Sequence, residues 1–301
     1  MIPLAADFLR GSYTPLITPF RDGAVDFAAY AKLVDWQIAQ GTNGIVVAGT
    51  SGEPTALTTT ERYQLLETAL DAAHKRVPVI AATGAASHAD TAQLTEHATK
   101  AGADAILVLT PMFAKPPQRA LKAYFLDIAR RTDKPILLYQ ISSRTNATLT
   151  LETCAEIMAT APHVIGMKQS DPDRPFVRAA LKKFGPEFRI FMGLSEIAWD
   201  MVGEGACGLI VALANIVPKI ISEIARDAKA GRISEARAAY ASIDALNTAA
   251  FLETNPLPLK YLAWRMGLIP VLEYRLPLAA PMPDLAQRLD AALIAAGLIP
   301  N

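Results

Sequence analysis

The sequence predicts an α/β protein whose core is a (β/α)8 TIM barrel, followed by a C-terminal helical extension. Three observations support this fold: about eight short apolar runs rich in β-branched residues, helical periodicity between them, and runs that stay apolar throughout. Strands of this last kind belong to a sheet that is covered on both faces. Strand and helix alternating about eight times within 301 residues indicates a single closed parallel barrel.

The expected elements follow each other in a regular order. Strands are expected at residues 13–20, 44–49, 78–84, 105–110, 135–140, 164–169, 189–193 and 208–213. Helical periodicity covers residues 27–40, 59–74, 90–100 and 118–131. The helix starts are marked by the N-cap candidates Thr58, Asp90 and Thr150. Two helix ends are marked by Gly41 and Gly102, each at the C′ position directly after its helix.

The last part of the chain is helical throughout. From about Val217 the helical pattern covers residues 218–230, 234–250, 258–267 and 283–296, which is more helix than the final barrel unit requires. We therefore expect residues 1–232 to form the barrel and residues 233–301 to form a C-terminal extension packed on it. The sequence between them contains no low-complexity linker, so a separately moving second domain is not expected.

Composition narrows the class of partner to a small molecule. Lys plus Arg and Asp plus Glu number 29 each, a balance that favours neither nucleic acid nor an anionic membrane surface. The N-terminus lacks the basic lead of a signal peptide, and no apolar run reaches the ~20 residues that span a bilayer. Cys154 and Cys207 are far apart and resemble buried thiols, so we expect a cytoplasmic protein.

The end of one expected strand carries a lysine, Lys168, in the run Val164–Gln169. Apolar surroundings favour the neutral amine of a lysine, which can attack a ketone and form a Schiff base. The strand ends of a barrel converge on one pocket, so Lys168 should meet Tyr139 and the turn Gly49–Glu53 there. The alternatives are a lysine whose ammonium reaches solvent and a tyrosine that belongs to the core.

Four motifs together resemble the dihydrodipicolinate synthase and N-acetylneuraminate lyase family. They are GTSGE at Gly49–Glu53, Tyr139 followed by Ser143-Arg144-Thr145, IGMK ending at Lys168, and Pro256–Lys260. The resemblance covers nearly the whole chain in the right order. It implies a barrel enzyme that usually forms homotetramers built from dimers. It also implies a covalent imine between lysine and pyruvate or another 2-keto acid, with no separate cofactor and no metal.

The resemblance assigns roles by matching position. Lys168 matches the Schiff-base lysine, and Tyr139 matches the tyrosine that transfers protons at the keto acid. Thr50 and Ser51 match the pair that binds the substrate carboxylate, and Thr50 also matches the residue that hydrogen-bonds the tyrosine. Gly193 and Ile210 match residues that line the pyruvate site. Arg144 matches the arginine that binds the carboxylate of a second substrate. The alternative roles are turn formation for Thr50 and Ser51 and a surface or interface ion pair for Arg144.

The chain departs from the family pattern at two places. Synthases and lyases usually carry two aromatic residues after the fourth strand, the second a tyrosine that crosses the dimer interface, and this chain has Met112 and Phe113. A phenylalanine cannot carry a proton. Asn146 stands where the synthase motif has glycine. Both positions belong to the second-substrate half, so the class of chemistry is better specified than the named reaction.

Several functions remain open at this stage. The first is a dihydrodipicolinate synthase-like condensation of pyruvate with an aldehyde. The alternatives are an aldolase or dehydratase for another 2-keto acid, and a non-catalytic keto-acid-binding protein. A metal-dependent aldolase is disfavoured because the four histidines are scattered, and the chain lacks nucleotide-binding glycine motifs. The second substrate, the direction of reaction, feedback by lysine and the oligomer size are not specified by the sequence.

Overall fold

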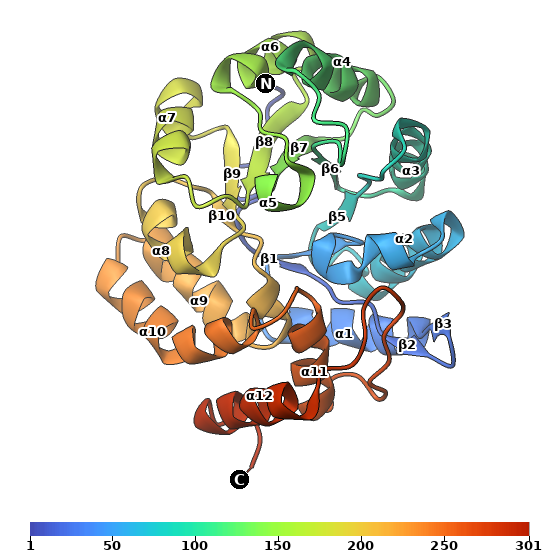
Figure 1. Ribbon diagram of the computed structural model, residues 1–301. Coiled ribbons are helices and arrows are strands. Elements are labelled where there is room, and N and C mark those ends of the chain that lie inside the picture. The colour runs from blue at the N-terminus through green and yellow to red at the C-terminus, as the bar shows by residue number, and fades with distance from the viewer. Residues whose placement is uncertain (301) are drawn as a thin grey trace.

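The chain folds into a closed barrel of eight parallel strands, which confirms the predicted fold class (Figure 1). The computed structural model describes residues 1–300. Around the barrel the strands follow the order β1-β10-β9-β8-β7-β6-β5-β4, and β4 closes on β1. Their bounds are β1 (Gly11–Pro15), β4 (Gly44–Val47), β5 (Val79–Ala82), β6 (Ala105–Leu109), β7 (Ile136–Gln140), β8 (Val164–Gln169), β9 (Arg189–Met192) and β10 (Gly208–Leu209).

The barrel wall separates two apolar cores. Successive side chains of a strand point to opposite faces of the sheet, so neighbouring residues enter different cores. Val46 and Ile80 belong to the cluster inside the barrel. Ile45 and Val79, one position away, belong to the cluster between the strands and the surrounding helices. Burial on both faces explains why these strands are apolar throughout.

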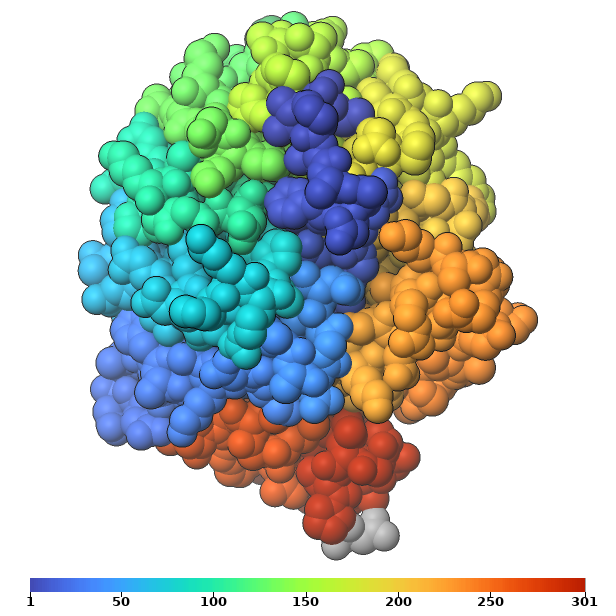
Figure 2. Space-filling view, turned by 180° about the vertical axis from the view of Figure 1, so that it is seen from behind, coloured from blue at the N-terminus to red at the C-terminus, as the bar shows by residue number. Residues whose placement is uncertain are grey.

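The N-terminal segment covers one end of the barrel. Figure 2 shows it in dark blue, lying across the back of the molecule between the green and yellow parts of the chain. Ile2, Leu4 and Phe8 pack against the cluster inside the barrel. The buried Arg189 side chain, at the start of β9, donates from Nε to the carbonyl oxygen of Phe8 at 3.2 Å. A cavity opens at the other end, where the strands finish.

Helices surround the barrel in the predicted alternation. Their bounds are α1 (Phe27–Ala39), α2 (Thr59–Ala73), α3 (His88–Ala101), α4 (Gln118–Ala129), α5 (Ser142–Thr145), α6 (Leu151–Thr160), α7 (Arg174–Phe184), α8 (Ser195–Gly203), α9 (Pro218–Lys229), α10 (Ile233–Ala249), α11 (Leu257–Arg265) and α12 (Pro283–Ala295). Three short 3-10 helices are η1 (Thr50–Gly52), η2 (Pro54–Ala56) and η3 (Ala212–Asn215). Two of them, η1 and η3, follow barrel strands and contribute residues to the cavity.

Most of the predicted helix ends are confirmed. Thr58 caps α2 in a reciprocal capping box with Glu61, and Thr150 caps α6. Gly41 follows α1 and Gly102 ends α3, with φ of +86° and +92°. These left-handed conformations are the reason glycine ends a helix favourably.

The N-cap predicted at Asp90 is wrong. Helix α3 begins at His88, and its N-cap is Ser87, whose hydroxyl accepts a hydrogen bond from the Asp90 N–H at 3.4 Å. Serine is as good a cap as aspartate, and it comes three positions earlier. Asp90 instead lies in the first turn, where the partial positive charge of the helix N-terminus stabilises a carboxylate.

The strand predicted for residues 13–20 ends early. Strand β1 stops at Pro15, and a two-stranded hairpin follows, formed by β2 (Phe20–Arg21) and β3 (Ala24–Val25). The loop Asp22-Gly23 has positive φ at both residues, +53° and +78°. An Asp-Gly pair with that geometry is a favoured two-residue hairpin loop, so this sequence signal was available.

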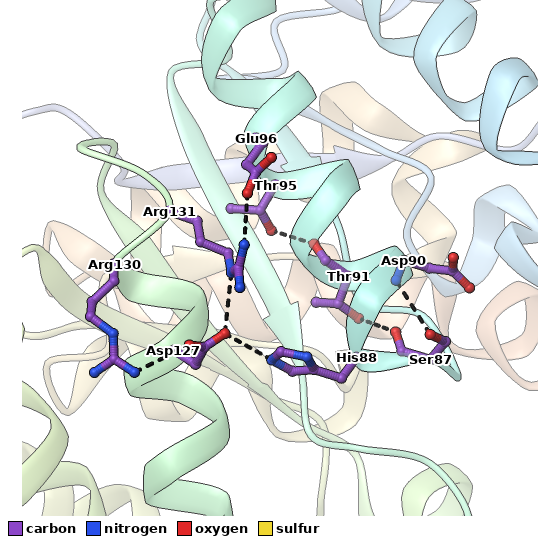
Figure 3. A network of polar contacts seen from close by, with 9 residues as sticks. All are labelled: Ser87, His88, Asp90, Thr91, Thr95, Glu96, Asp127, Arg130 and Arg131. Carbon is purple, nitrogen blue, oxygen red and sulfur yellow. Dashed lines mark hydrogen bonds and ion pairs between the residues drawn. The ribbon is translucent and has the colours of Figure 1, made fainter.

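A surface network joins α3 to α4 (Figure 3). His88 lies 3.0 Å from Asp127, and Arg131 contacts both Asp127 at 3.1 Å and Glu96 at 2.8 Å. The hydrogen bonds from Arg130 and then Arg131 lower the pKa of Asp127. Partly exposed ion pairs contribute only about 0–1 kcal/mol each, so this network orients two helices more than it stabilises the fold.

The C-terminal helices lie beside the barrel, in orange and red in Figure 1. Helix α9 packs on β1 and β10 as the last barrel helix, α10 packs on α8 and α9, and α11 packs on α12. The predicted boundary at residue 232 falls directly before α10, and we propose it as the start of the extension. Residue 301, the last of the expected extension, lies outside the described residues. Among residues 1–300, the helices lack the length and apolarity to cross a membrane.

Candidate active site

A cavity of about 510 Å³ opens where the barrel strands end. The predicted site residues Thr50, Ser51, Tyr139, Arg144, Lys168, Gly193 and Ile210 all line it. Further lining residues are Pro15, Ile141, Ser143, Ser170, Leu194, Ala212 and the segment Phe251–Asn255. The structure thus gathers every residue predicted to contact the keto acid or the second substrate.

Lys168 and Tyr139 are direct neighbours in the barrel wall. Strands β7 and β8 pair so that Tyr139 lies opposite Lys168. Lys168 is 5% exposed, and its Nζ lies 4.3 Å from the centroid of the Tyr139 ring. None of the ion pairs within residues 1–300 includes Lys168. A buried amine without a carboxylate partner, facing a cavity, has the environment of a nucleophile.

Tyr139 is held by hydroxyl groups. Its Oη lies 3.1 Å from Thr50 Oγ1, which comes from the turn after β4. Burial tends to raise the pKa of Tyr139, but the charge of Lys168 and hydrogen bonds with Thr50, Ser170 and Lys168 outweigh burial and lower it. A tyrosine with a lowered pKa transfers protons more readily near neutral pH.

The turn that carries Thr50 and Ser51 is fixed on two sides. The carbonyl of Gly52 accepts a hydrogen bond from Thr18 Oγ1 at 2.7 Å. Asn255 Nδ2, from the segment before α11, lies 3.1 Å from Ser51 Oγ. Ser51 is 2% exposed and lines the cavity.

Gly193 and Ile210 form part of the cavity wall. A Cβ added to Gly193 would lie 1.9 Å from Ser170 Oγ, so the close approach of these two strand ends requires glycine. Ile210 is fully buried and directly follows β10. The N–H of Ile210 donates to the carbonyl of Met192 at 2.8 Å, which extends the strand pairing into the site.

Arg144 also lines the cavity and is exposed. It belongs to the short helix α5, which is anchored by Asp171 Oδ1 accepting hydrogen bonds from the N–H and hydroxyl of Ser142, both at 2.8 Å. Arg144 Nη2 donates to the carbonyl of Asn255 at 3.0 Å. The guanidinium is therefore positioned at the cavity edge, and its exposed part can accept a charged group.

The two departures from the family pattern lie outside this cavity. Phe113 is 87% exposed, is left-handed with φ +65°, and is not among the lining residues. Asn146 is exposed and ends α5 with φ +51°. Asparagine is one of the few residues other than glycine that adopts this conformation readily, so Asn146 replaces glycine in a turn.

Four polar residues that line this cavity were absent from the sequence-based expectations: Ser170, Glu253, Thr254 and Asn255. Ser170 lies two residues beyond Lys168, and the period-two alternation of a strand could have placed both on one side. Asn255 immediately precedes the motif Pro256–Lys260, but its contact with Ser51 spans 204 residues. No local sequence pattern signals a contact of that range.

Comparison with known proteins identifies the family. The sequence model of the dihydrodipicolinate synthetase family matches residues 8–296. The chain belongs to this family. It is therefore an enzyme, and the sequence-based prediction of a carbon–carbon or carbon–oxygen lyase of this family is confirmed in its carbon–carbon form. These findings support the synthase-like prediction rather than a sugar-acid aldolase, a dehydratase or a non-catalytic binding protein.

Relatives cover nearly the whole chain. The 4-hydroxy-tetrahydrodipicolinate synthase of Persephonella marina is 39% identical over 290 residues, which is 96% of this chain and 99% of that protein. Dihydrodipicolinate synthase from Aquifex aeolicus has a TM-score of 0.94 and 33% identity, covering 97% of this chain and 100% of that one. The chloride-inhibited synthase from Acinetobacter baumannii, solved with pyruvate, has a TM-score of 0.93 and 36% identity, with the same coverage.

Proposed function

We propose that this family member condenses pyruvate with an aldehyde through an imine on Lys168, as a 4-hydroxy-tetrahydrodipicolinate synthase. The observation that carries the proposal is the buried amine of Lys168, which has no carboxylate partner in the described part of the chain and lies beside Tyr139, whose hydroxyl meets Thr50. Lysine itself supplies the covalent activation, so the proposal requires no separate cofactor.

The residues divide the chemistry between them. The Lys168 amine attacks the ketone carbon of pyruvate, and the oxygen leaves as water to give the imine. Loss of a proton from the methyl group then gives an enamine, whose carbon adds to the aldehyde. Tyr139 and Thr50 pass protons during these steps, while the turn at Ser51 holds the pyruvate carboxylate by N–H and hydroxyl groups.

Gly193, Ile210 and Arg144 complete the proposed site. Gly193 and Ile210 bring backbone close to the pyruvate half, where a larger residue at 193 would collide with Ser170. Arg144 would bind the carboxylate of the second substrate at the cavity edge, because guanidinium groups pair with carboxylates in a bidentate manner. An acidic aldehyde such as aspartate semialdehyde fits this arrangement.

Arg144→Ala is expected to raise KM for an acidic aldehyde by about 10- to 150-fold, the equivalent of about 1.5–3 kcal/mol for a charged hydrogen bond. The KM of a neutral aldehyde should change little, since it offers no carboxylate. Steady-state kinetics with both aldehydes test this, with the substitution of an exposed arginine on α10, Arg237→Ala, as the control. Equal effects on both aldehydes, or none, would give Arg144 a structural role.

Phe113→Tyr tests whether a missing hydroxyl limits the rate. Without a tyrosine at this position, Tyr139 and Thr50 must transfer protons within one subunit. We expect the natural protein to be slower than Phe113→Tyr with pyruvate and aspartate semialdehyde, by up to about 10²–10⁴-fold, which is the usual value of a positioned proton donor. The assay is pyruvate-dependent condensation, and it also tests the proposed reaction. Ordinary turnover that the substitution leaves unchanged would show that the hydroxyl is immaterial.

We also propose a homo-oligomer, a dimer or tetramer, working in the cytoplasm. Phe113 has a left-handed backbone conformation and an exposed side chain. This supports an interface between subunits, since large apolar side chains are seldom so exposed to solvent. The buried free thiols Cys154 and Cys207 are compatible with a reducing compartment. Sedimentation velocity measures the oligomer directly.

A further inference from the structure

A second buried lysine lies close to the site without lining the cavity. Lys260, on α11, is fully buried, and its Nζ lies 2.8 Å from Oε1 of Glu53, whose side chain is 2% exposed. The Lys260 Nζ also lies 4.1 Å from the centroid of the Phe20 ring. The proposed reaction assigns no role to either member of this pair.

The charges of Arg275 and Glu273 act on this ion pair, but neither group forms a hydrogen bond with it. Among the described residues, neither the Lys260 Nζ nor the two carboxylate oxygens of Glu53 have any further hydrogen-bond partner. Burial raises the pKa of Glu53 and lowers that of Lys260, and the attraction between them opposes both shifts. A buried pair of this kind adds little stability, because well-packed apolar residues of similar volume often serve equally well. Its presence therefore calls for another explanation.

The location of Glu53 supplies one. Glu53 directly follows Thr50-Ser51-Gly52 and ends η1 in a left-handed conformation with φ +55°. A non-glycine residue in this conformation is strained and persists where its surroundings hold it. The Gly52 carbonyl accepts a hydrogen bond from Thr18 at 2.7 Å, and the Glu53 side chain joins the next residue of the turn to Lys260 on α11.

The C-terminal extension holds the same stretch of chain at two further points. Asn255 contacts Ser51 at 3.1 Å. Arg275, beyond α11, donates to the carbonyl of Ala56 at 3.0 Å and to the carboxylate of Glu61 at 2.7 Å. The segment from Ser51 to Glu61 is thus attached to the extension along its length, and Glu53–Lys260 is its only fully buried ion pair among the described residues.

We infer that Glu53 and Lys260 are positioning residues, which lock the turn carrying Thr50 and Ser51 to α11 so that both hydroxyls face the keto acid and Tyr139. The inference rests on the proposed pyruvate chemistry for its kinetic consequence. Its structural consequence, a rigid turn, does not depend on that chemistry. The extension is on this account a required part of the site.

The test is a cycle of variants: Glu53→Gln, Lys260→Met, and both together. Each single variant leaves one charge buried and unpaired, so we expect reduced stability and non-additive effects. The double variant removes both charges at similar volume and should remain folded, with a melting temperature near that of the natural protein. In that folded variant, the pyruvate concentration for half-maximal borohydride trapping of Lys168 should rise about tenfold or more, from loss of well-placed carboxylate contacts.

Hydrogen exchange of the backbone amides of Gly49–Glu53 is the second measurement. Exchange there should accelerate at least about tenfold in the double variant, with α4 unchanged as the internal reference. The control is Arg178→Gln/Glu204→Gln, which removes an exposed pair at 2.6 Å between α7 and the end of α8. A folded double variant with unchanged exchange and unchanged pyruvate dependence would overturn the inference. If the natural protein forms no imine, the proposed function fails, and exchange alone decides the role of the pair.

Discussion

Lys168→Ala is expected to lose imine formation entirely and turnover by about 10⁴-fold or more, by comparison with the removal of other covalent nucleophiles. The barrel should stay folded, because Lys168 takes part in no ion pair within residues 1–300 and its strand is held by backbone pairing with β7 and β9. Circular dichroism and thermal melting establish that the variant is folded before its activity is measured.

Borohydride reduction in the presence of pyruvate locates the imine. The pyruvate-derived mass should appear on the peptide that contains Lys168 and should be missing from Lys168→Ala. Lys260 provides an internal comparison, since it is also buried, with 0% exposed against 5% for Lys168, but is paired with Glu53. Lys182→Ala, an exposed lysine on α7, is the matched control and should keep both adduct and turnover. An adduct on Lys260, or none at all, would end the Schiff-base proposal.

Tyr139→Phe should give the second-largest effect, a fall in kcat of about 10²–10⁴-fold with the protein still folded. The substitution keeps the ring beside Lys168 and removes only the hydroxyl that meets Thr50 at 3.1 Å. Proton transfer should therefore suffer more than pyruvate binding. Because the lowered pKa of Tyr139 is lost with the hydroxyl, the alkaline limb of the pH–rate profile should also change.

Tyr124→Phe is the matched control for this prediction. Tyr124 lies on α4, and its hydroxyl lies 3.4 Å from the carbonyl of Leu109, outside the cavity. We expect near-natural kcat for this variant. Comparable losses in the two variants would indicate a general effect of removing tyrosine hydroxyls, and full activity of Tyr139→Phe would exclude Tyr139 from proton transfer.

Local patterns in the sequence determined the barrel and the main chemical groups. Apolar runs of strand length predicted the order of the strands. The ends of two of these runs identified Lys168 and Tyr139 as candidate site residues, because a parallel barrel brings its strand ends together on one face. Capping residues such as Thr58 act within one turn, so they are visible in sequence. The same local signals failed where two candidates compete, as Ser87 and Asp90 do at the start of α3.

Only the tertiary structure decided how the site is supported. The contact of Asn255 with Ser51 and the pairing of Lys260 with Glu53 each join the C-terminal extension to a turn near the start of the barrel. In the sequence, Glu53 and Lys260 belong to two separate motifs, and nothing local indicates that they pair or that Asn255 reaches Ser51. Their roles depend on burial and on distances of about 3 Å between groups far apart in sequence, which only packing of the extension on the barrel creates.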